Sequence, residues 1–236
     1  MFHIDFYYIV LVVPTIILSM IAQIMVKSTF AKYSKVPCSK RITGQDSAAL
    51  LLRANNIRDV KIEAVGGSLT DHYDPSSKVV RLSRPVYGEI SIAAVGVAAH
   101  ETGHAIQHAR GYGPLFLRST LVPVANIGSR VGPLLAMAGL FFSSNPSSSG
   151  IAQLLFNIGI LLFGGAVLFY VITLPVEFNA SARAIAILRS NNVLSKDELN
   201  GVKKVLTAAA MTYVASALTA MMSLLRLILL SRNRRR

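Results

Sequence analysis

The sequence predicts a mostly α-helical membrane protein, in which transmembrane helices accompany a small α+β domain with a short β-hairpin or sheet. Hydrophobic residues make up 53% of its 236 residues and charged residues only 15%, whereas a soluble domain has about 25% charged residues. Four apolar stretches are long enough to lie in or across a bilayer with a hydrocarbon core about 30 Å thick. Between them lie polar segments with turn residues. The lipid bilayer is therefore an expected partner.

The first apolar stretch, residues 6–26, predicts an N-terminal transmembrane helix within residues 1–26. It contains no charged residue. A cleaved signal peptide would need a basic beginning and a shorter apolar core. Lys27, Lys32 and Lys35 follow the stretch, and such cations are typical of the cytoplasmic edge of a span. We therefore expect an uncleaved helix with its N-terminus outside.

The next segment, residues 27–118, is more polar and combines helix and strand patterns. A short amphipathic helix is expected over residues 43–56. Residues 68–73 and 79–83 contain β-type residues on either side of an Asp-Pro-Ser-Ser turn. Aspartate, proline and serine favour tight turns, so we expect a β-hairpin here.

A helix over residues 92–110 carries the motif His-Glu-x-x-His. On a helix, His100 and His104 lie on nearly the same face, roughly 6 Å apart along the axis. Both imidazoles can therefore reach one zinc ion at about 2.0–2.1 Å. Glu101 points to another side of the turn, where it can take a proton from metal-activated water, as in metalloproteases. Residues 27–118 thus form the expected catalytic segment.

Two histidines in a polar surface patch are the alternative interpretation of this motif. The residues before it are apolar or small, and those after it continue an apolar face. Burying that much polarity without a partner would cost several kcal/mol. A bound metal offsets this cost, so the surroundings favour a zinc site.

Residues 119–175 predict a transmembrane helical hairpin. Its two apolar halves are separated by an uncharged polar loop at residues 144–150. Pro123, Arg130 and Pro133 interrupt the first half. A charged side chain inside a bilayer is costly, so Arg130 is expected to face protein, water or a lipid headgroup.

Residues 176–204 predict a helix that carries the third metal ligand. Pro175 is expected to end the preceding span, which would place Glu177 in the first turn of a new helix. An acidic residue there can simply interact with the helix dipole. A catalytic zinc, however, needs three protein ligands, and His-His-Glu is a common set. We therefore expect one zinc ion per chain, held by His100, His104 and Glu177.

Three further residues are weaker candidates for contacts with substrate or with an oxyanion: His72, Tyr73 and Arg183. A local structural role explains His72 equally well, so it is not counted among the ligands. Arg183 can also be a salt-bridge partner. His108 continues the row of helical histidines but lies about 12 Å along the axis from His100. His108 therefore cannot share the same metal, and we expect it either to support neighbouring residues as a polar side chain or to lie at the surface.

The last segment, residues 205–236, predicts a membrane-associated helix and a basic tail. Residues 27–118 contain 13 Lys and Arg, residues 183–204 contain five, and the loop at 144–150 contains none. The positive-inside rule then places the catalytic segments in the cytoplasm. A fourth full span would put the arginine-rich tail outside, against this rule. The last helix therefore either spans the bilayer or lies at its inner surface, and the sequence leaves both open.

The net charge of +13 does not indicate nucleic-acid binding. Nucleic-acid binding needs a basic face interleaved with residues that read bases, and here the basic residues cluster beside apolar runs. Nucleic acid is therefore not an expected partner. The single cysteine, Cys38, excludes an internal disulfide and a cysteine-based zinc site.

Four stretches of the sequence resemble a known family. They are LTDHYDP (69–75), AAVGVAAHETGHAIQHA (93–109), LPVEFNASARA (174–184) and AAAMTYVA (208–215). Over nearly the whole chain, the sequence is similar to the bacterial membrane-bound neutral zinc metallopeptidases of the YugP type. It more distantly resembles HtpX and the CAAX-processing membrane proteases, which also place two spans between the His-Glu-x-x-His helix and a helix with a glutamate ligand.

The resemblance implies a mostly helical gluzincin-like fold with a small sheet. Its edge strand would carry Leu69–Tyr73 and could pair with an extended peptide. The resemblance assigns the metal to His100, His104 and Glu177 and the role of base to Glu101. The distant relatives have the pattern E-[FY]-x-A-D, whereas Ser181 stands at the aspartate position here.

These observations predict a multi-pass protein of the cell membrane that acts as a zinc-dependent endopeptidase. Its expected substrate is a peptide or a membrane protein, and its active site is expected near the cytoplasmic surface. The alternative is a non-catalytic, metal-binding membrane scaffold that recruits partner proteins. An intact Glu101 argues against the scaffold, because a structural site has no use for a general base.

Overall fold

The computed structural model describes residues 5–143 and 149–234, and the chain divides into two compact units. The first, which we call the membrane unit, comprises Met1–Ile21, Leu117–Leu174 and Thr212–Arg236. The second, the α+β unit, comprises Ala22–Phe116 and Pro175–Met211. Each unit is described by itself.

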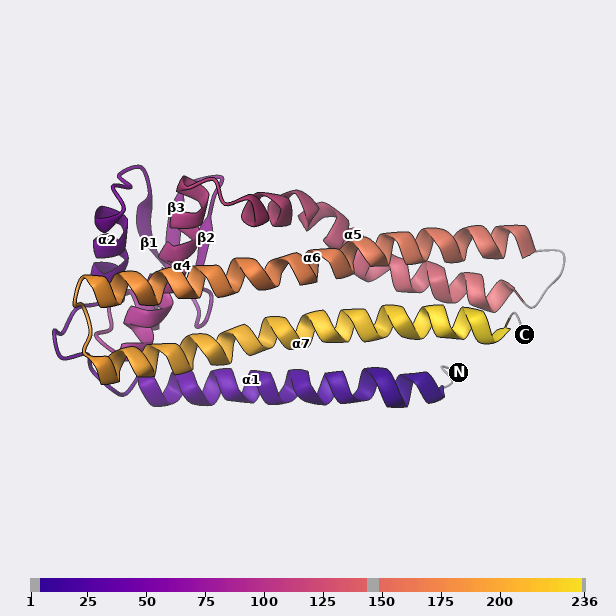
Figure 1. Ribbon diagram of the computed structural model, residues 1–236, viewed down its shortest axis with the longest axis horizontal. Coiled ribbons are helices and arrows are strands. Elements are labelled where there is room, and N and C mark those ends of the chain that lie inside the picture. The colour runs from indigo at the N-terminus through magenta and orange to yellow at the C-terminus, as the bar shows by residue number, and fades with distance from the viewer. Residues whose placement is uncertain (1–4, 144–148, 235–236) are drawn as a thin grey trace. The chain divides into compact units, whose positions relative to one another are not determined.

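Long apolar helices build the membrane unit (Figure 1). Within the described residues, four helices are long and apolar enough to cross a membrane, which confirms the predicted mostly α-helical membrane fold. They are α1 (Val13–Tyr33), preceded by the π-helical turn η1 (Tyr8–Val12), α5 (Gly113–Phe142), α6 (Ser149–Ser190) and α7 (Lys196–Arg234). The predicted loop at residues 144–150 lies mostly outside the described residues.

The prediction that a new helix begins after Pro175 is wrong, because α6 continues through this residue to Ser190. A proline inside a helix removes one backbone hydrogen bond and costs about 3 kcal/mol or more. Contacts of the residues that follow it offset this cost, as the buried side chains of Val176, Glu177 and Ala180 show. Glu177 therefore lies in the interior of a helix. The alternative in which it merely interacts with a helix N-terminus does not apply.

Within the membrane unit, glycines bring α5 and α6 together. A side chain at Gly128 would collide with the backbone carbonyl of Leu162, and one at Gly132 would meet Phe163. Such small residues allow the backbones of two membrane helices to approach closely. The predicted helical hairpin is thus packed along a seam of glycines.

The α+β unit contains α2 (Gly44–Ala54), α3 (Arg84–Tyr87) and α4 (Ile92–Ala109), together with a three-stranded sheet. A reciprocal capping box between Thr43 and Asp46 starts α2. Ser195 and Glu198 exchange the same kind of bonds at the start of α7. These caps satisfy backbone N–H groups that have no partner within the helix. They explain why α2 begins at Gly44 and α7 begins at Lys196.

The sheet consists of β1 (Lys61–Val65), β2 (His72–Asp74) and β3 (Val79–Ser83), in the order β1-β3-β2. The central strand β3 pairs parallel with β1 and antiparallel with β2. The predicted hairpin is therefore present, but its first strand begins at His72 and not at residue 68. Positive φ angles at Gly67 (96°) and Leu69 (57°) place these residues outside the extended conformation that a strand needs.

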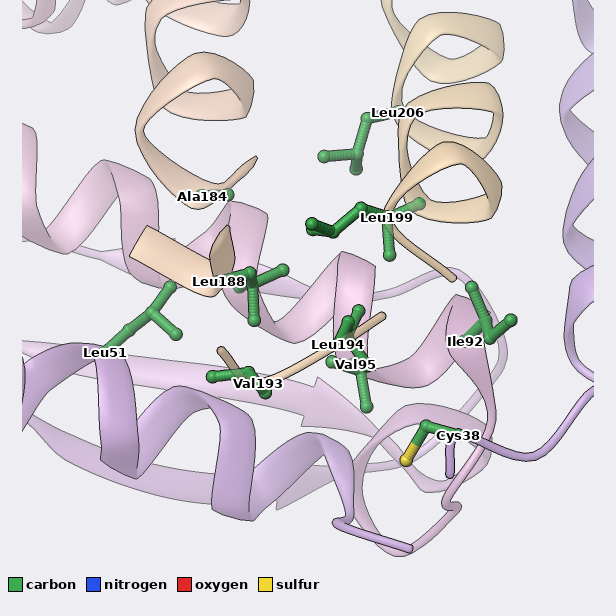
Figure 2. Close-up of a cluster of buried hydrophobic side chains, with 12 residues drawn as sticks. Cys38, Leu51, Ile92, Val95, Ala184, Leu188, Val193, Leu194, Leu199 and Leu206 are labelled. Atoms are coloured by element: carbon green, nitrogen blue, oxygen red, sulfur yellow. The ribbon is translucent and has the colours of Figure 1, made fainter. Parts of the chain in front are cut away.

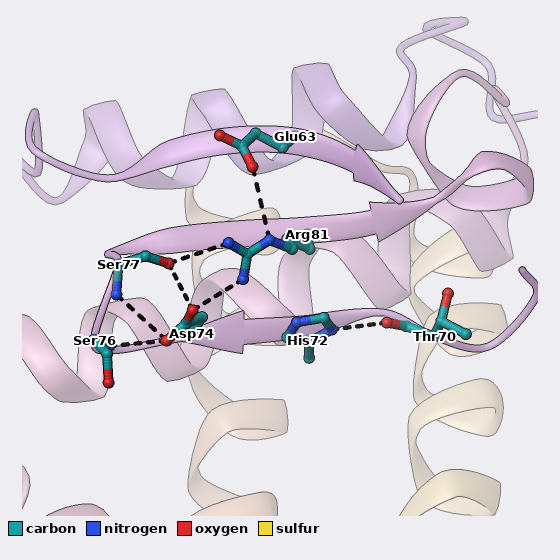
Figure 3. Close-up of polar contacts among 7 residues, drawn as sticks. All are labelled: Glu63, Thr70, His72, Asp74, Ser76, Ser77 and Arg81. Carbon is teal, nitrogen blue, oxygen red and sulfur yellow. Dashed lines mark hydrogen bonds and ion pairs between the residues drawn. The ribbon is translucent and has the colours of Figure 1, made fainter. Parts of the chain in front are cut away.

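A polar cluster ties the hairpin turn to the central strand (Figure 3). Asp74 accepts a 2.6 Å hydrogen bond from the Ser77 hydroxyl and a 2.9 Å bond from Arg81. Arg81 also lies 3.7 Å from a carboxylate oxygen of Glu63 on β1. Most of these side chains are exposed or half-exposed, so solvent screens their attraction.

The core of the α+β unit holds α4 against the end of α6. One cluster of buried apolar side chains joins residues of α2, α4, α6 and α7 (Figure 2). Leu188 of α6 and Val95 of α4 are fully buried in it. A second cluster packs Ile106 of α4 against Val80 and Leu82 of the sheet. Burying one such side chain contributes about 1.5–3 kcal/mol, so this core fixes α4 between the sheet and α6.

Candidate metal centre

The predicted histidine ligands lie on α4, whose position is set at its start and along its length. Ser91 caps the helix by accepting a 3.1 Å hydrogen bond from the Ala94 N–H. Small and apolar residues then bury most of the helix from Ile92 to Gln107. A helix buried on most sides has little room for large side chains. The alanines and glycines of α4 meet this requirement.

Gly103, inside the His-Glu-x-x-His motif, sets how closely α4 approaches α6. A Cβ atom at this position would lie 2.6 Å from the backbone oxygen of Ala180, closer than atoms pack without strain. The backbones of α4 and α6 therefore touch at this point. Glu177 and Ser181 lie within one turn of Ala180 on α6, so the contact brings both residues to the histidines.

The structure brings the three predicted ligands together. Oε2 of Glu177 lies 3.2 Å from Nε2 of His100 and 3.5 Å from Nε2 of His104. One ligand atom from each residue lies within 4.8 Å of the others. The Glu177 side chain is 2% exposed and those of His100 and His104 are 12% and 10% exposed. A carboxylate this buried needs partners, and the two imidazoles are its partners.

These distances fit a tetrahedral zinc ion. Atoms at about 2.0–2.1 Å from a shared tetrahedral centre lie roughly 3.4 Å from one another, close to the separations of Glu177 Oε2 from His100 and His104. The His-His-Glu set also leaves a fourth position for water or substrate, as catalytic zinc sites do. The donor set and these separations therefore fit a bound zinc ion.

Each histidine is held through its second ring nitrogen. Nδ1 of His100 lies 3.0 Å from the Ser181 hydroxyl, and Nδ1 of His104 lies 3.0 Å from Oε1 of Gln107. Such outer contacts orient metal-binding imidazoles. Ser181 thus contacts the predicted ligand His100. It does so from the position at which the more distant proteases carry an aspartate, with a neutral hydroxyl in place of a carboxylate.

Sequence reasoning missed Gln107 and Asn179. Gln107 is fully buried, and its Nε2 donates to the Val176 carbonyl at 2.8 Å and to Oδ1 of Asn179 at 3.0 Å. One signal was available: Gln107 follows His104 by three residues, a spacing at which helical side chains are neighbours. The contacts with α6, by contrast, join residues about 70 positions apart in the chain and carry no local signal.

The weaker candidates lie outside the group of ligand atoms. His72 is exposed, and its Nδ1 lies 2.8 Å from the Thr70 carbonyl (Figure 3), a local bond of the structural kind. The Tyr73 hydroxyl lies 2.8 Å from Nδ1 of His108, which gives His108 the supporting contact expected of it. Burial, and to a lesser degree the nearby charges of Asp59 and Asp74, raise the pKa of Tyr73 to about 12.

Arg183 and Glu101 complete the set of predicted residues. Nε of Arg183 donates to Oδ1 of Asn179 at 2.7 Å, and the guanidinium lies 5.9 Å from the centre of the Tyr112 ring. Glu101 is half-buried on α4, directly after His100. The position of Glu101 beside a ligand is the one that the motif predicts for a general base.

Comparisons with known proteins point to a family of zinc peptidases. A family model described as "Putative neutral zinc metallopeptidase" matches residues 8–232. The chain is 49% identical over 228 residues to "Putative membrane protease YugP" of Bacillus subtilis (strain 168), covering 97% of this chain and 98% of that protein. No solved structure matches the chain. Sequence motifs, fold and comparisons together show that this membrane protein belongs to the neutral zinc metallopeptidase family.

Proposed function

We propose that the protein is a membrane endopeptidase that hydrolyses peptide bonds with one zinc ion per chain. His100, His104 and Glu177 hold the metal, and Glu101 is the general base. The observation that carries this proposal is the meeting of two helical histidines with the buried carboxylate of Glu177, which lies on another helix. The similarity to zinc metallopeptidases over residues 8–232 supports it.

Zinc bound at this site supplies a Lewis acid that polarises a peptide carbonyl and lowers the pKa of water toward about 7. The chain provides the proton transfers. The Glu101 carboxylate accepts a proton from the attacking water and then delivers it to the leaving amine. The contact between Gly103 and Ala180 keeps α4 and α6 in register, so the base and the ligands keep their relative positions.

The proposed active site faces the cytoplasm and acts on peptides or membrane proteins. The basic residues of the segments at 27–118 and 183–204 support this side of the membrane. Glu177 follows Leu174, the last residue of α6 in the membrane unit, by only three positions. A helix rises about 1.5 Å per residue, so the site lies close along α6 to the segment that crosses the bilayer. This proximity favours substrates that are themselves held at the membrane.

The replacement Glu101→Gln tests the proposal. It keeps the size of the side chain but removes the base. Zinc content and thermal stability should match the wild type, while cleavage of fluorescently labelled casein by the purified full-length protein should fall by about 10²–10⁴-fold. Glu89→Gln, which alters an exposed carboxylate of the same unit, is the matched control and should retain full activity.

Two results would contradict the endopeptidase proposal. One is undiminished cleavage by Glu101→Gln. The other is a wild-type protein that binds zinc but cleaves neither casein nor unfolded membrane proteins in vesicles, a result that would favour the non-catalytic scaffold.

A further inference from the structure

An exposed arginine lies near the middle of one of the membrane helices. Arg130 is on α5, about halfway between Leu117, where this helix enters the membrane unit, and Phe142, where it ends. At about 1.5 Å of rise per residue, either end is roughly 18 Å away. An arginine near the end of a span can extend to the lipid headgroups. Arg130 is too far from both ends of α5 to do so.

The side of α5 that carries Arg130 points away from α6. At about 100° per residue, Arg130 lies roughly 160° around the helix from Gly132, whose Cβ would meet α6. Asn126, one turn earlier on the same side as Arg130, is also exposed. The apolar side chains of Ile127 and Leu134 are exposed on this part of the helix. Two polar side chains therefore lie among side chains that are suited to lipid.

Arg130 has no partner in the part of the chain that the structure describes. No hydrogen bond, ion pair or ring contact within residues 5–143 and 149–234 involves its side chain. Arg226 of α7, by contrast, is paired. Its Nε donates to Oδ2 of Asp5 at 2.9 Å, and its guanidinium lies 5.2 Å from the centre of the Tyr8 ring. A charged side chain inside a bilayer is costly unless it meets a partner, so Arg130 requires one from another molecule.

A second copy of this chain has no carboxylate in its membrane unit to offer to Arg130. Asp5 is the single acidic residue in the sequence of that unit, and Arg226 already binds it. Two copies inserted in the same direction would also place their Arg130 side chains at the same depth, where like charges repel. The complementary charge is therefore expected from a different membrane protein.

We propose that the α5 docking face, which we define by Asn126 and Arg130, binds a transmembrane helix of another protein that carries an aspartate or glutamate near the middle of the bilayer. The Arg130 guanidinium donates to this carboxylate, and a charge-assisted bond of this kind is strong. The Asn126 amide can donate and accept, so it bonds a second polar group about one turn away on the partner helix. The docking face belongs to the membrane unit and requires no zinc.

A synthetic transmembrane peptide tests this proposal. The probe is a helix of leucine and alanine with one glutamate at its centre and a dansyl group at each end. The chain contains no tryptophan, so Phe141→Trp, at an exposed position of α5, gives the full-length protein a single energy donor. Energy transfer in phosphatidylcholine vesicles measures association. The glutamate peptide should bind about 3- to 30-fold more tightly than a peptide with leucine at its centre, as expected for polar bonds between membrane helices.

Replacing Arg130 should remove this preference. In the Phe141→Trp background, Arg130→Leu should bind the glutamate and leucine peptides equally. Arg130→Lys keeps the positive charge and should retain most of the preference. The Arg130 side chain is exposed, so both variants should unfold at the same temperature as the parent protein. Arg232→Leu is the matched control, because it removes an exposed arginine from α7 in the same unit, and it should leave the preference unchanged.

Four results would overturn the proposal. Equal binding of the two peptides by the protein with Arg130 intact would do so, and so would a preference that survives in Arg130→Leu. If phosphatidylglycerol in the vesicles abolishes the preference, an anionic lipid headgroup occupies the docking face. If the protein associates with itself in peptide-free vesicles and Arg130→Leu prevents this, the face binds a second copy.

Discussion

Each of the two parts of α6 packs closely against another helix through a glycine, but the two contacts serve different purposes. In the membrane unit, the part up to Leu174 packs against α5, and Gly128 meets the Leu162 carbonyl. In the α+β unit, the part from Pro175 onward packs against α4, and Gly103 meets the Ala180 carbonyl. In both places a glycine lets two helix backbones touch.

The difference lies in what surrounds each contact. In the first part of α6, the buried Thr173 hydroxyl donates to the Phe169 carbonyl of the same helix. Large apolar side chains of this part, such as Leu161, are exposed and suited to contact with lipid. In the second part, Glu177, Asn179 and Ser181 all contact side chains of α4. A close helix contact thus gives either an apolar seam or a buried donor set, depending on which residues flank it.

The largest effect should come from removing the buried carboxylate of the second part. Glu177→Ala should abolish zinc binding, because a catalytic zinc needs three protein ligands, and His104→Ala should do the same. Thr173→Ala, one turn earlier on the same helix, should keep one zinc per chain. Metal analysis of detergent-purified protein after dialysis measures this. Zinc that persists in Glu177→Ala would show that the third ligand lies elsewhere, with His72 the next residue to test.

An intermediate effect should follow from adding a methyl group at either contact. Gly103→Ala and Gly128→Ala both force a Cβ against a backbone of the neighbouring helix, and overpacking of this kind costs about 1–3 kcal/mol of stability. Only Gly103→Ala should also weaken zinc binding, by about tenfold or more, because it separates the helices that carry the ligands.

Thermal unfolding and chelator competition distinguish these two variants. Gly164→Ala is the control, since nothing lies within 4 Å of a Cβ at this position. Equal losses of zinc affinity in Gly103→Ala and Gly128→Ala would mean that the two contacts are not functionally different.

The smallest effect should come from the exposed polar cluster of the sheet, away from both contacts. Hydrogen bonds from the Ser77 hydroxyl and then from Arg81 hold the pKa of Asp74 well below its usual range. The folded state therefore favours the ionised carboxylate. Its stabilising contribution is complete above the unfolded pKa of about 3.9 and is lost as the pH falls toward the folded pKa.

Asp74→Asn should accordingly lower the melting temperature slightly at pH 7 and flatten its decline in acid, with zinc binding intact. Melting curves of the metal-free protein between pH 3 and pH 7, with Glu89→Gln beside them, check this expectation. If the melting temperature of Asp74→Asn falls with decreasing pH as steeply as that of the wild type, other groups cause most of the acid destabilisation.

Much of the fold was predictable because its signals are local. The uncharged run at residues 6–26 indicated a span, and the amphipathic pattern of residues 43–56 indicated a short helix. Other features had no local signal. Pro175 suggested a helix end, but the packing of Val176 and Glu177 keeps α6 intact. The parallel pairing of β1 with β3 also joins segments that no turn connects directly.

The features of the candidate site likewise divide into those that the sequence predicts and those that only the structure shows. The sequence by itself determined the spacing of His100 and His104 and the place of Glu101 between them, because four residues make about one helical turn. Only the tertiary structure decided that α4 and α6 touch at Gly103, and that Gln107 meets Val176 and Asn179. Helix periodicity fixes neighbours within a turn or two. Which distant side chains meet depends on how the whole chain packs.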